Sequence, residues 1–182
     1  MTAAELLSVA AFREGRYAQA FPSFGSERTG APVVAFCRIA DAAIRSHEPI
    51  TSPDAVIIQD PTLLHQVDVF NGLHEDGYLL INSSLSFATL GLGAFVTRFR
   101  PARLRTVPGT EIAREVVGRP IANAVLLGSF AALTGVVSID AVAAAIRERF
   151  PGALAERNVA GAQRAFEYVS KDMKELAGAQ AD

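Results

Sequence analysis

The chain has few of the residues that hold metal ions, disulfides or iron–sulfur clusters. Its 182 residues include one cysteine, Cys37, three histidines and no tryptophan. A single cysteine excludes an intramolecular disulfide and an iron–sulfur cluster held by this chain alone. His47, His65 and His74 lack the spacing to cysteine or acidic residues that is typical of a metal site, so we assign them surface or capping roles. We therefore expect any electron-transfer centre to lie on a partner.

The sequence also lacks a strong charge of one sign and a long apolar segment. The formal net charge is −2, which gives no general attraction to nucleic acid or to an anionic membrane. No apolar run reaches the roughly 18 residues of a membrane span, and nothing resembles a signal peptide. We predict a cytoplasmic protein that binds neither nucleic acid nor membrane.

No pattern in the sequence indicates that this chain is catalytic by itself. Neither a Ser-His-Asp arrangement nor a phosphate-binding P-loop can be argued from it. Half of the residues are hydrophobic, which is high for a freestanding soluble monomer. We predict a single domain, residues 1–182, with no catalytic residue and no metal ligand, that buries apolar surface against other subunits.

Apolar runs alternate with polar stretches, as in α/β proteins. Residues 55–58 and 77–82 are typical of buried parallel strands, and residues 103–107 are a further strand candidate. Between the first two, Asp60 is predicted to cap a helix over residues 62–70. Other predicted helices cover residues 2–12, 110–117, 120–133, 139–150 and 154–176. The pattern predicts a Rossmann-like, mostly parallel sheet with helices on both faces and a helical C-terminal part.

A polar loop with two glycines lies between two predicted strands, residues 16–21 and 32–39. Its glycines allow positive φ and close backbone approach, although turn geometry alone explains them equally well. Arg28 is the first choice for a functional side chain, because its guanidinium binds carboxylate or phosphate bidentately. An ion pair with Glu27, or with another subunit, is the alternative. The candidate anion or interface site consists of Gly25, Ser26, Glu27, Arg28, Thr29 and Gly30.

Two asparagines and four arginines are further candidates. Asn123 and Asn158 lie on apolar helical segments, where a buried amide needs partners, so they either bond neighbouring loops or contact a ligand. The arginines belong either to a solvated or interface loop or to a site for a phosphate-bearing ligand or an acidic partner. They are Arg98, Arg100, Arg103 and Arg105.

Three further groups of residues have simpler interpretations. Asp60 and residues 82–84 follow predicted parallel strands, where ligands of open α/β sheets bind, although helix capping alone explains Asp60. Cys37 lies on an apolar strand and is interpreted as inert core. Gly128, Gly161 and Ala165 indicate close packing between helices.

Several motifs together resemble the gamma subunit, or gamma domain, of 2-oxoacid:ferredoxin oxidoreductases. Residues 21–31, Phe-Pro-Ser-Phe-Gly-Ser-Glu-Arg-Thr-Gly-Ala, are similar to that family's Tyr-(Pro)-Ser-Tyr-Gly-Pro-Glu-x-Arg-Gly-Gly loop. Residues 108–113 and 121–128 resemble its Pro-x-x-x-Ala and Asn-x-x-x-Leu-Gly segments. Asn158, Gly161 and Ala165 stand where the family shows Asn-x-x-Ala-x-x-x-Gly. The resemblance spans the whole chain.

The resemblance implies a pyruvate- or 2-oxoglutarate-type enzyme that converts a 2-oxoacid and coenzyme A to acyl-CoA, CO2 and reduced ferredoxin. It implies alpha and beta partner subunits, with a delta subunit in some assemblies, which carry thiamine diphosphate, Mg2+ and 4Fe-4S clusters. The gamma part then shapes the active-site entrance and helps to handle coenzyme A, for which residues 25–30 are the candidates. The alternatives are a subunit of an indolepyruvate:ferredoxin oxidoreductase and a non-catalytic nucleotide-binding or scaffold module.

One departure from the family concerns the beginning of the printed sequence. In the family a first strand and a Gly-x-Gly-Gly-Gln-Gly turn precede the first helix, and neither precedes residues 2–12 here. A central strand left out of a parallel sheet leaves backbone groups unpaired on both sides. We expect the reading frame to continue upstream with both features.

Overall fold

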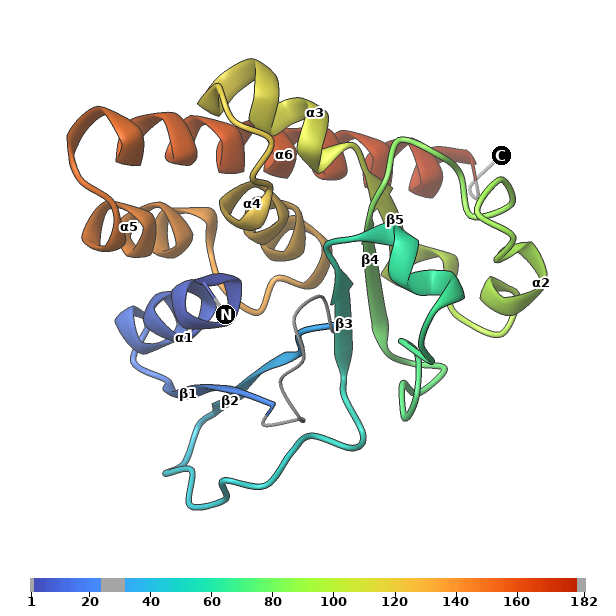
Figure 1. The fold of residues 1–182 in the computed structure, drawn as a ribbon, viewed down its shortest axis with the longest axis horizontal. Helices are drawn as coiled ribbons and strands as arrows, with labels where there is room; N and C mark the ends of the chain where they lie inside the picture. Colours follow the sequence, from blue (N-terminus) through green and yellow to red (C-terminus); the bar gives the residue numbers. More distant parts are fainter. Residues whose placement is uncertain (1, 24–31, 180–182) are drawn as a thin grey trace.

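The computed structural model describes residues 2–23 and 32–179, and Figure 1 shows their arrangement. The longer helices are α1 (Thr2–Arg13), α4 (Asn123–Thr134), α5 (Ile139–Arg149) and α6 (Gly152–Ala179). The strands are β1 (Tyr17–Pro22), β2 (Ala35–Ala40), β3 (Ala55–Ile58), β4 (Tyr78–Asn82) and β5 (Leu104–Val107). Shorter helical segments are η1 (Pro61–His65), α2 (Gly93–Val96), η2 (Pro101–Arg103), α3 (Gly109–Ile112) and the π-helical turn η3 (Ala113–Val117).

Strands β3, β4 and β5 form a parallel sheet in that order, with Ile57 beside Leu80 and Leu80 beside Arg105. Leu79, Leu80 and Ile81 in the central strand are at most 1% exposed, as expected for a strand covered on both faces. In Figure 1 the sheet separates α4, on its left, from α2, on its right. The predicted α/β class, with a parallel sheet and a helical C-terminal part, is confirmed.

Strands β1 and β2 form a separate antiparallel pair, with Phe21 beside Phe36 and Ala20 beside Cys37. Both strands were predicted, but their separation from the parallel sheet was not. Alternate residues of the pair, including Ala18, Cys37 and Ile39, pack against the main core. On the other face the rings of Phe21 and Phe36 lie 5.3 Å apart. The pair thus forms a second, smaller layer next to α1 (Figure 1).

The crossover between β3 and β4 differs from the predicted helix over residues 62–70. Asp60 caps as predicted and Pro61 is the first helical residue, but the helical segment is a 3-10 turn that ends at His65. The Oδ1 atom of Asp68 then accepts a bond from the Phe70 backbone nitrogen at 3.4 Å. This local bond competes with the helical pattern, and the remainder of the crossover is irregular.

The helical core is built around α4, which is apolar on all sides and is buried between α5, α6 and the sheet. Gly128 of α4 lies against the backbone of Ala162 in α6, so close that a Cβ atom there would be 1.9 Å from the Ala162 carbonyl oxygen. Gly161 faces Val125 and Val117, and Ala165 is fully buried. The predicted role of these small residues in close helix packing is confirmed.

Candidate functional site

A polar crevice lies where the carboxyl ends of β3, β4 and β5 meet. Its cavity volume is about 390 Å³. It is lined by the segments that leave β3 and β4 and by the start of α3, which follows β5, namely Gln59, Asp60, Pro61, Asn82, Ser83, Ser84, Leu85, Thr110 and Glu111. This is the edge at which open α/β sheets bind ligands.

Asn82 holds the three segments of the crevice together. Its Nδ2 atom donates to the Gln59 carbonyl oxygen and to the Thr110 hydroxyl, each at 2.8 Å. Its Oδ1 atom accepts from the Thr110 backbone nitrogen at 3.1 Å. Gly109 allows this contact, because a Cβ atom there would lie 3.0 Å from Oδ1. Asn82 is 7% exposed, so its amide is committed to structure rather than free for a ligand.

The remaining polar groups of the crevice are acceptors and hydroxyls. Asp60 accepts from the Thr62 hydroxyl at 2.7 Å and from the Thr62 backbone nitrogen at 2.9 Å, and these two bonds lower the pKa of its carboxyl. Glu111 adds a second carboxyl group, and no lysine or arginine is among the described residues that line the crevice. The crevice therefore favours hydroxyl or cationic groups, and it does not suit phosphate.

Sequence reasoning identified part of this crevice. Asp60 and residues 82–84 were singled out because they follow parallel strands. Thr110 and Glu111 were not, although they follow the strand candidate at residues 103–107 in the same way. A position shortly after a predicted parallel strand is the sequence feature that identifies all of these crevice residues.

The predicted loop site and the two asparagines do not join the crevice. Gly25, Ser26, Glu27, Arg28, Thr29 and Gly30 lie outside the described residues, and their role stays a prediction. Asn123 is the first residue of α4, is half-buried and has no side-chain hydrogen bond within the described part of the chain.

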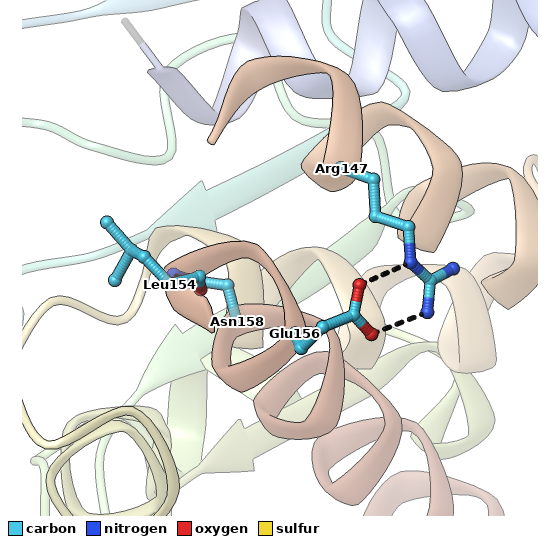
Figure 2. A network of polar contacts seen from close by, with 4 residues as sticks. All are labelled: Arg147, Leu154, Glu156 and Asn158. Atoms are coloured by element: carbon cyan, nitrogen blue, oxygen red, sulfur yellow. Dashed lines mark hydrogen bonds and ion pairs between the residues drawn. The ribbon is translucent and has the colours of Figure 1, made fainter. Parts of the chain in front are cut away.

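Asn158 lies on α6, which packs against α4, and Figure 2 shows it one turn after Leu154. Its Nδ2 atom donates to the Leu154 carbonyl oxygen at 2.8 Å, so the amide is satisfied within α6 and bonds no loop through this nitrogen. The neighbouring Glu156 receives two bonds from Arg147 of α5, at 2.7 and 2.9 Å (Figure 2), which lower the pKa of its carboxyl. These contacts join α5 to α6. A ligand role for Asn123 or Asn158 remains a prediction.

The four clustered arginines do not form one anion site. Arg105 is buried on β5, 2.6 Å from Asp172 of α6. Arg100 pairs with Asp76 at 2.8 Å, and Arg103 donates to the Asp76 carbonyl oxygen and lies over the Tyr78 ring. Arg98 has neither an ion pair nor a side-chain hydrogen bond among the described residues, whereas each of the other three arginines has at least one. Three of the four arginines are thus occupied by contacts within the chain, and Arg105 is buried rather than solvated, so a shared site for a phosphate-bearing ligand is not supported.

Cys37 is shielded in the β1–β2 pair, and burial raises the pKa of its thiol from 9.0 to about 12. The change lowers the thiolate fraction near neutral pH by about a thousandfold. We expect iodoacetamide at pH 8 to label the folded chain at least about a hundredfold more slowly than the urea-unfolded chain, as followed by mass spectrometry.

The raised pKa of the Cys37 thiol also makes the free energy of unfolding depend on pH. The thiol of the unfolded chain ionises near pH 9, whereas that of the folded chain stays neutral, so the free energy of unfolding should fall between pH 9 and about 12. Cys37→Ala should remove this part of the decline. An equal decline in both proteins, or equal labelling of folded and unfolded chain, would contradict the assignment of Cys37 to inert core.

The described residues show neither a metal-binding cluster nor a membrane-spanning helix. Within residues 2–23 and 32–179, no group of three or more histidine, cysteine, aspartate or glutamate residues is placed to hold a metal ion. In the same part of the chain no helix has both the length and the apolar character needed to cross a membrane.

Comparison with known proteins gives consistent matches. Residues 1–168 match the family described as pyruvate ferredoxin/flavodoxin oxidoreductase. The chain is 46% identical over 171 residues to pyruvate synthase subunit PorC of Methanothermobacter thermautotrophicus, covering 94% of this chain and 89% of that protein. It is 45% identical over 166 residues to the pyruvate/ketoisovalerate oxidoreductases common subunit gamma of Thermococcus kodakarensis, covering 91% and 88%.

A solved structure supports the same relationship. The crystal structure of pyruvate oxidoreductase subunit PORC from Thermotoga maritima matches with a TM-score of 0.76 at 34% identity. The match covers 91% of this chain and 87% of that one. The likeness thus extends over most of the chain in both sequence and fold.

Proposed function

The chain belongs to the pyruvate ferredoxin/flavodoxin oxidoreductase family, and we propose that it acts as the gamma subunit of a 2-oxoacid:ferredoxin oxidoreductase. The observation that carries this proposal is the near full-length identity of 45–46% to proteins named PorC and common subunit gamma. The resemblance noted from the sequence motifs is confirmed at the level of the family. The whole chain, residues 1–182, then serves as one gamma domain in the cytoplasm.

The reaction is the oxidative decarboxylation of a 2-oxoacid with coenzyme A to acyl-CoA, CO2 and reduced ferredoxin. We assign thiamine diphosphate, Mg2+ and 4Fe-4S clusters to alpha, beta or delta subunits, where thiamine diphosphate supports decarboxylation and the clusters pass electrons to ferredoxin. The residues of this chain do not fit a cluster, because its one thiol is shielded and stays protonated. Its own contribution is to bind and position.

We propose pyruvate as the first substrate to test. The Thermococcus relative is named as a subunit common to pyruvate and ketoisovalerate oxidoreductases. By analogy, selection of the 2-oxoacid belongs to the partner subunits. Indolepyruvate and 2-oxoglutarate are the alternatives. Together with pyruvate they form the panel of 2-oxoacids to be tested for acyl-CoA formation.

Contact with coenzyme A is assigned to the loop of residues 25–30 rather than to the crevice. The crevice presents carboxyl groups of Asp60 and Glu111, which repel the phosphates of coenzyme A. The loop offers Arg28 together with hydroxyl groups, which are suitable phosphate ligands.

Purification of a tagged chain from its native cells tests the subunit assignment. We expect a larger subunit that contains thiamine diphosphate to co-purify, and the complex to form acyl-CoA from at least one 2-oxoacid of the panel. A chain that purifies without such a subunit would favour the scaffold alternative.

Arg28→Ala should damage the assembled enzyme more than Arg100→Ala. Loss of a charge-assisted hydrogen bond costs about 1.5–3 kcal/mol, which corresponds to roughly tenfold or more in the affected constant. Arg100 forms an exposed pair with Asp76, so its loss should change little. The measurement is the KM for coenzyme A and kcat of the purified complex. Equal constants for both variants would remove Arg28 from the proposed site.

A further inference from the structure

The two faces of the parallel sheet are covered very differently. On the face of Leu80 and Val107, the long helices α4 and α6 form the cover. On the face of Leu79 and Ile81, the cover consists of the crossovers that follow β3 and β4, which contain only the short segments η1, α2 and η2. Figure 1 shows this second layer to the right of the strands. We call it the crossover face.

The crossover face is incompletely buried. Among the described residues, its apolar cluster has 5 buried members and 10 that are only partly buried. The apolar cluster on the opposite face of the sheet, which contains α4 and α6, has the opposite proportion, with 27 buried and 14 partly buried members among the described residues. Val67 and Leu85, on the same two crossovers, are 41% and 48% exposed. The crossovers cover Leu79 and Ile81 of the sheet completely, but their own apolar side chains are only partly buried. An apolar layer that stays partly exposed has the composition of a surface that is completed by another molecule.

An aromatic stack on this face holds a basic group without a counter-ion. The ring of Phe95 lies 4.3 Å from that of Phe70 and 5.1 Å from that of Phe99. The Arg98 guanidinium carbon lies 4.8 Å above the Phe95 ring and 5.7 Å from the Phe99 ring. These contacts hold the guanidinium against the rings and leave its donors free, since Arg98 has no ion pair among the described residues.

The other arginines of the same crossover are already occupied. Arg100 pairs with Asp76, and Arg103 donates to the Asp76 carbonyl oxygen and stacks on Tyr78. Arg98 is therefore the group whose charge an incoming partner would match. A carboxylate at the rim of an apolar contact complements this arrangement in both charge and shape.

We propose that the crossover face is the docking surface for another subunit of the oxidoreductase, which presents apolar side chains and a carboxylate opposite Arg98. The inference rests on the proposed function, because it takes the partner to be a subunit of that complex.

The test compares two charge reversals in the co-expressed complex. Arg149, on α5, also lies over an aromatic ring, 5.9 Å from that of Phe150, and has no ion pair among the described residues, so Arg149→Glu is the matched control. We expect Arg98→Glu to weaken binding of the partner by about tenfold or more, and Arg149→Glu to change it less than about twofold. Val67→Asp and Ile121→Asp form a second pair at exposed apolar positions, and only Val67→Asp should weaken binding.

The far-ultraviolet circular dichroism and melting temperature of each variant identify any failure to fold. If the wild-type complex forms and the two members of each pair behave alike, the docking proposal is overturned while the proposed function stands. If no thiamine-diphosphate subunit co-purifies with the wild-type chain, both are overturned. A dimer of this chain alone that dissociates on Arg98→Glu, as seen by analytical ultracentrifugation, would overturn the docking proposal in favour of a second copy.

Discussion

Gly128→Ala should be among the most destabilising single substitutions in this chain. The new Cβ atom would lie 1.9 Å from the Ala162 carbonyl oxygen and 2.6 Å from its carbonyl carbon. Because these are backbone atoms of a long helix, the clash is relieved only when α4 and α6 move apart. We expect a loss of about 3 kcal/mol or more, which corresponds to a melting temperature lower by roughly 6–12 °C. Pulse proteolysis of the chain within its complex, across a urea series, measures the change.

Gly178→Ala is the matched control, since Gly178 lies near the end of α6 with open space around its Cα atom. Alanine favours the helix there, so this variant should be as stable as the wild type or more stable by up to about 1 kcal/mol. If both alanine variants unfold at the wild-type urea concentration, α4 and α6 do not pack as closely as described.

Asn82→Ala should have the second largest effect, because it removes three hydrogen bonds at the carboxyl edge of the sheet. The Gln59 carbonyl and the Thr110 backbone nitrogen lose their partner in a place that is largely shielded from water. We expect a cost of about 2–3 kcal/mol in the free energy of unfolding, measured by the same urea series.

Asn123→Ala serves as the comparison, since that amide is half-buried and makes no side-chain hydrogen bond within the described part of the chain. Its change in stability should stay within about 0.5 kcal/mol. Equal losses for Asn82→Ala and Asn123→Ala would show that the bonds of Asn82 do not organise the crevice.

Much of the fold follows from local sequence. The apolar runs of β3 and β4 fit a strand covered on both faces, and Ser138 caps α5 through its bond to the Ala141 backbone nitrogen. Gly118 and Gly135 adopt left-handed φ angles where helices end. Short-range chemistry decides each of these features, so a single sequence is sufficient to predict them.

The features that the sequence did not predict depend on distant contacts or on weak local competition. The separation of β1 and β2 from the parallel sheet reflects pairing between strands, which no short segment specifies. In the first crossover, the Asp68 side chain bonds the Phe70 backbone and the predicted helix ends early. The clustered arginines were ambiguous because their partners, such as Asp172 for Arg105, lie far along the chain.

The central claim is that an active 2-oxoacid:ferredoxin oxidoreductase requires this chain. The direct measurement is reconstitution from separately purified subunits, with ferredoxin reduction followed in the presence of pyruvate and coenzyme A. The account predicts that omitting this chain abolishes coenzyme A-dependent reduction and that adding it back restores the rate in proportion to the complex formed. Full activity without the chain, with any 2-oxoacid of the panel, would contradict it.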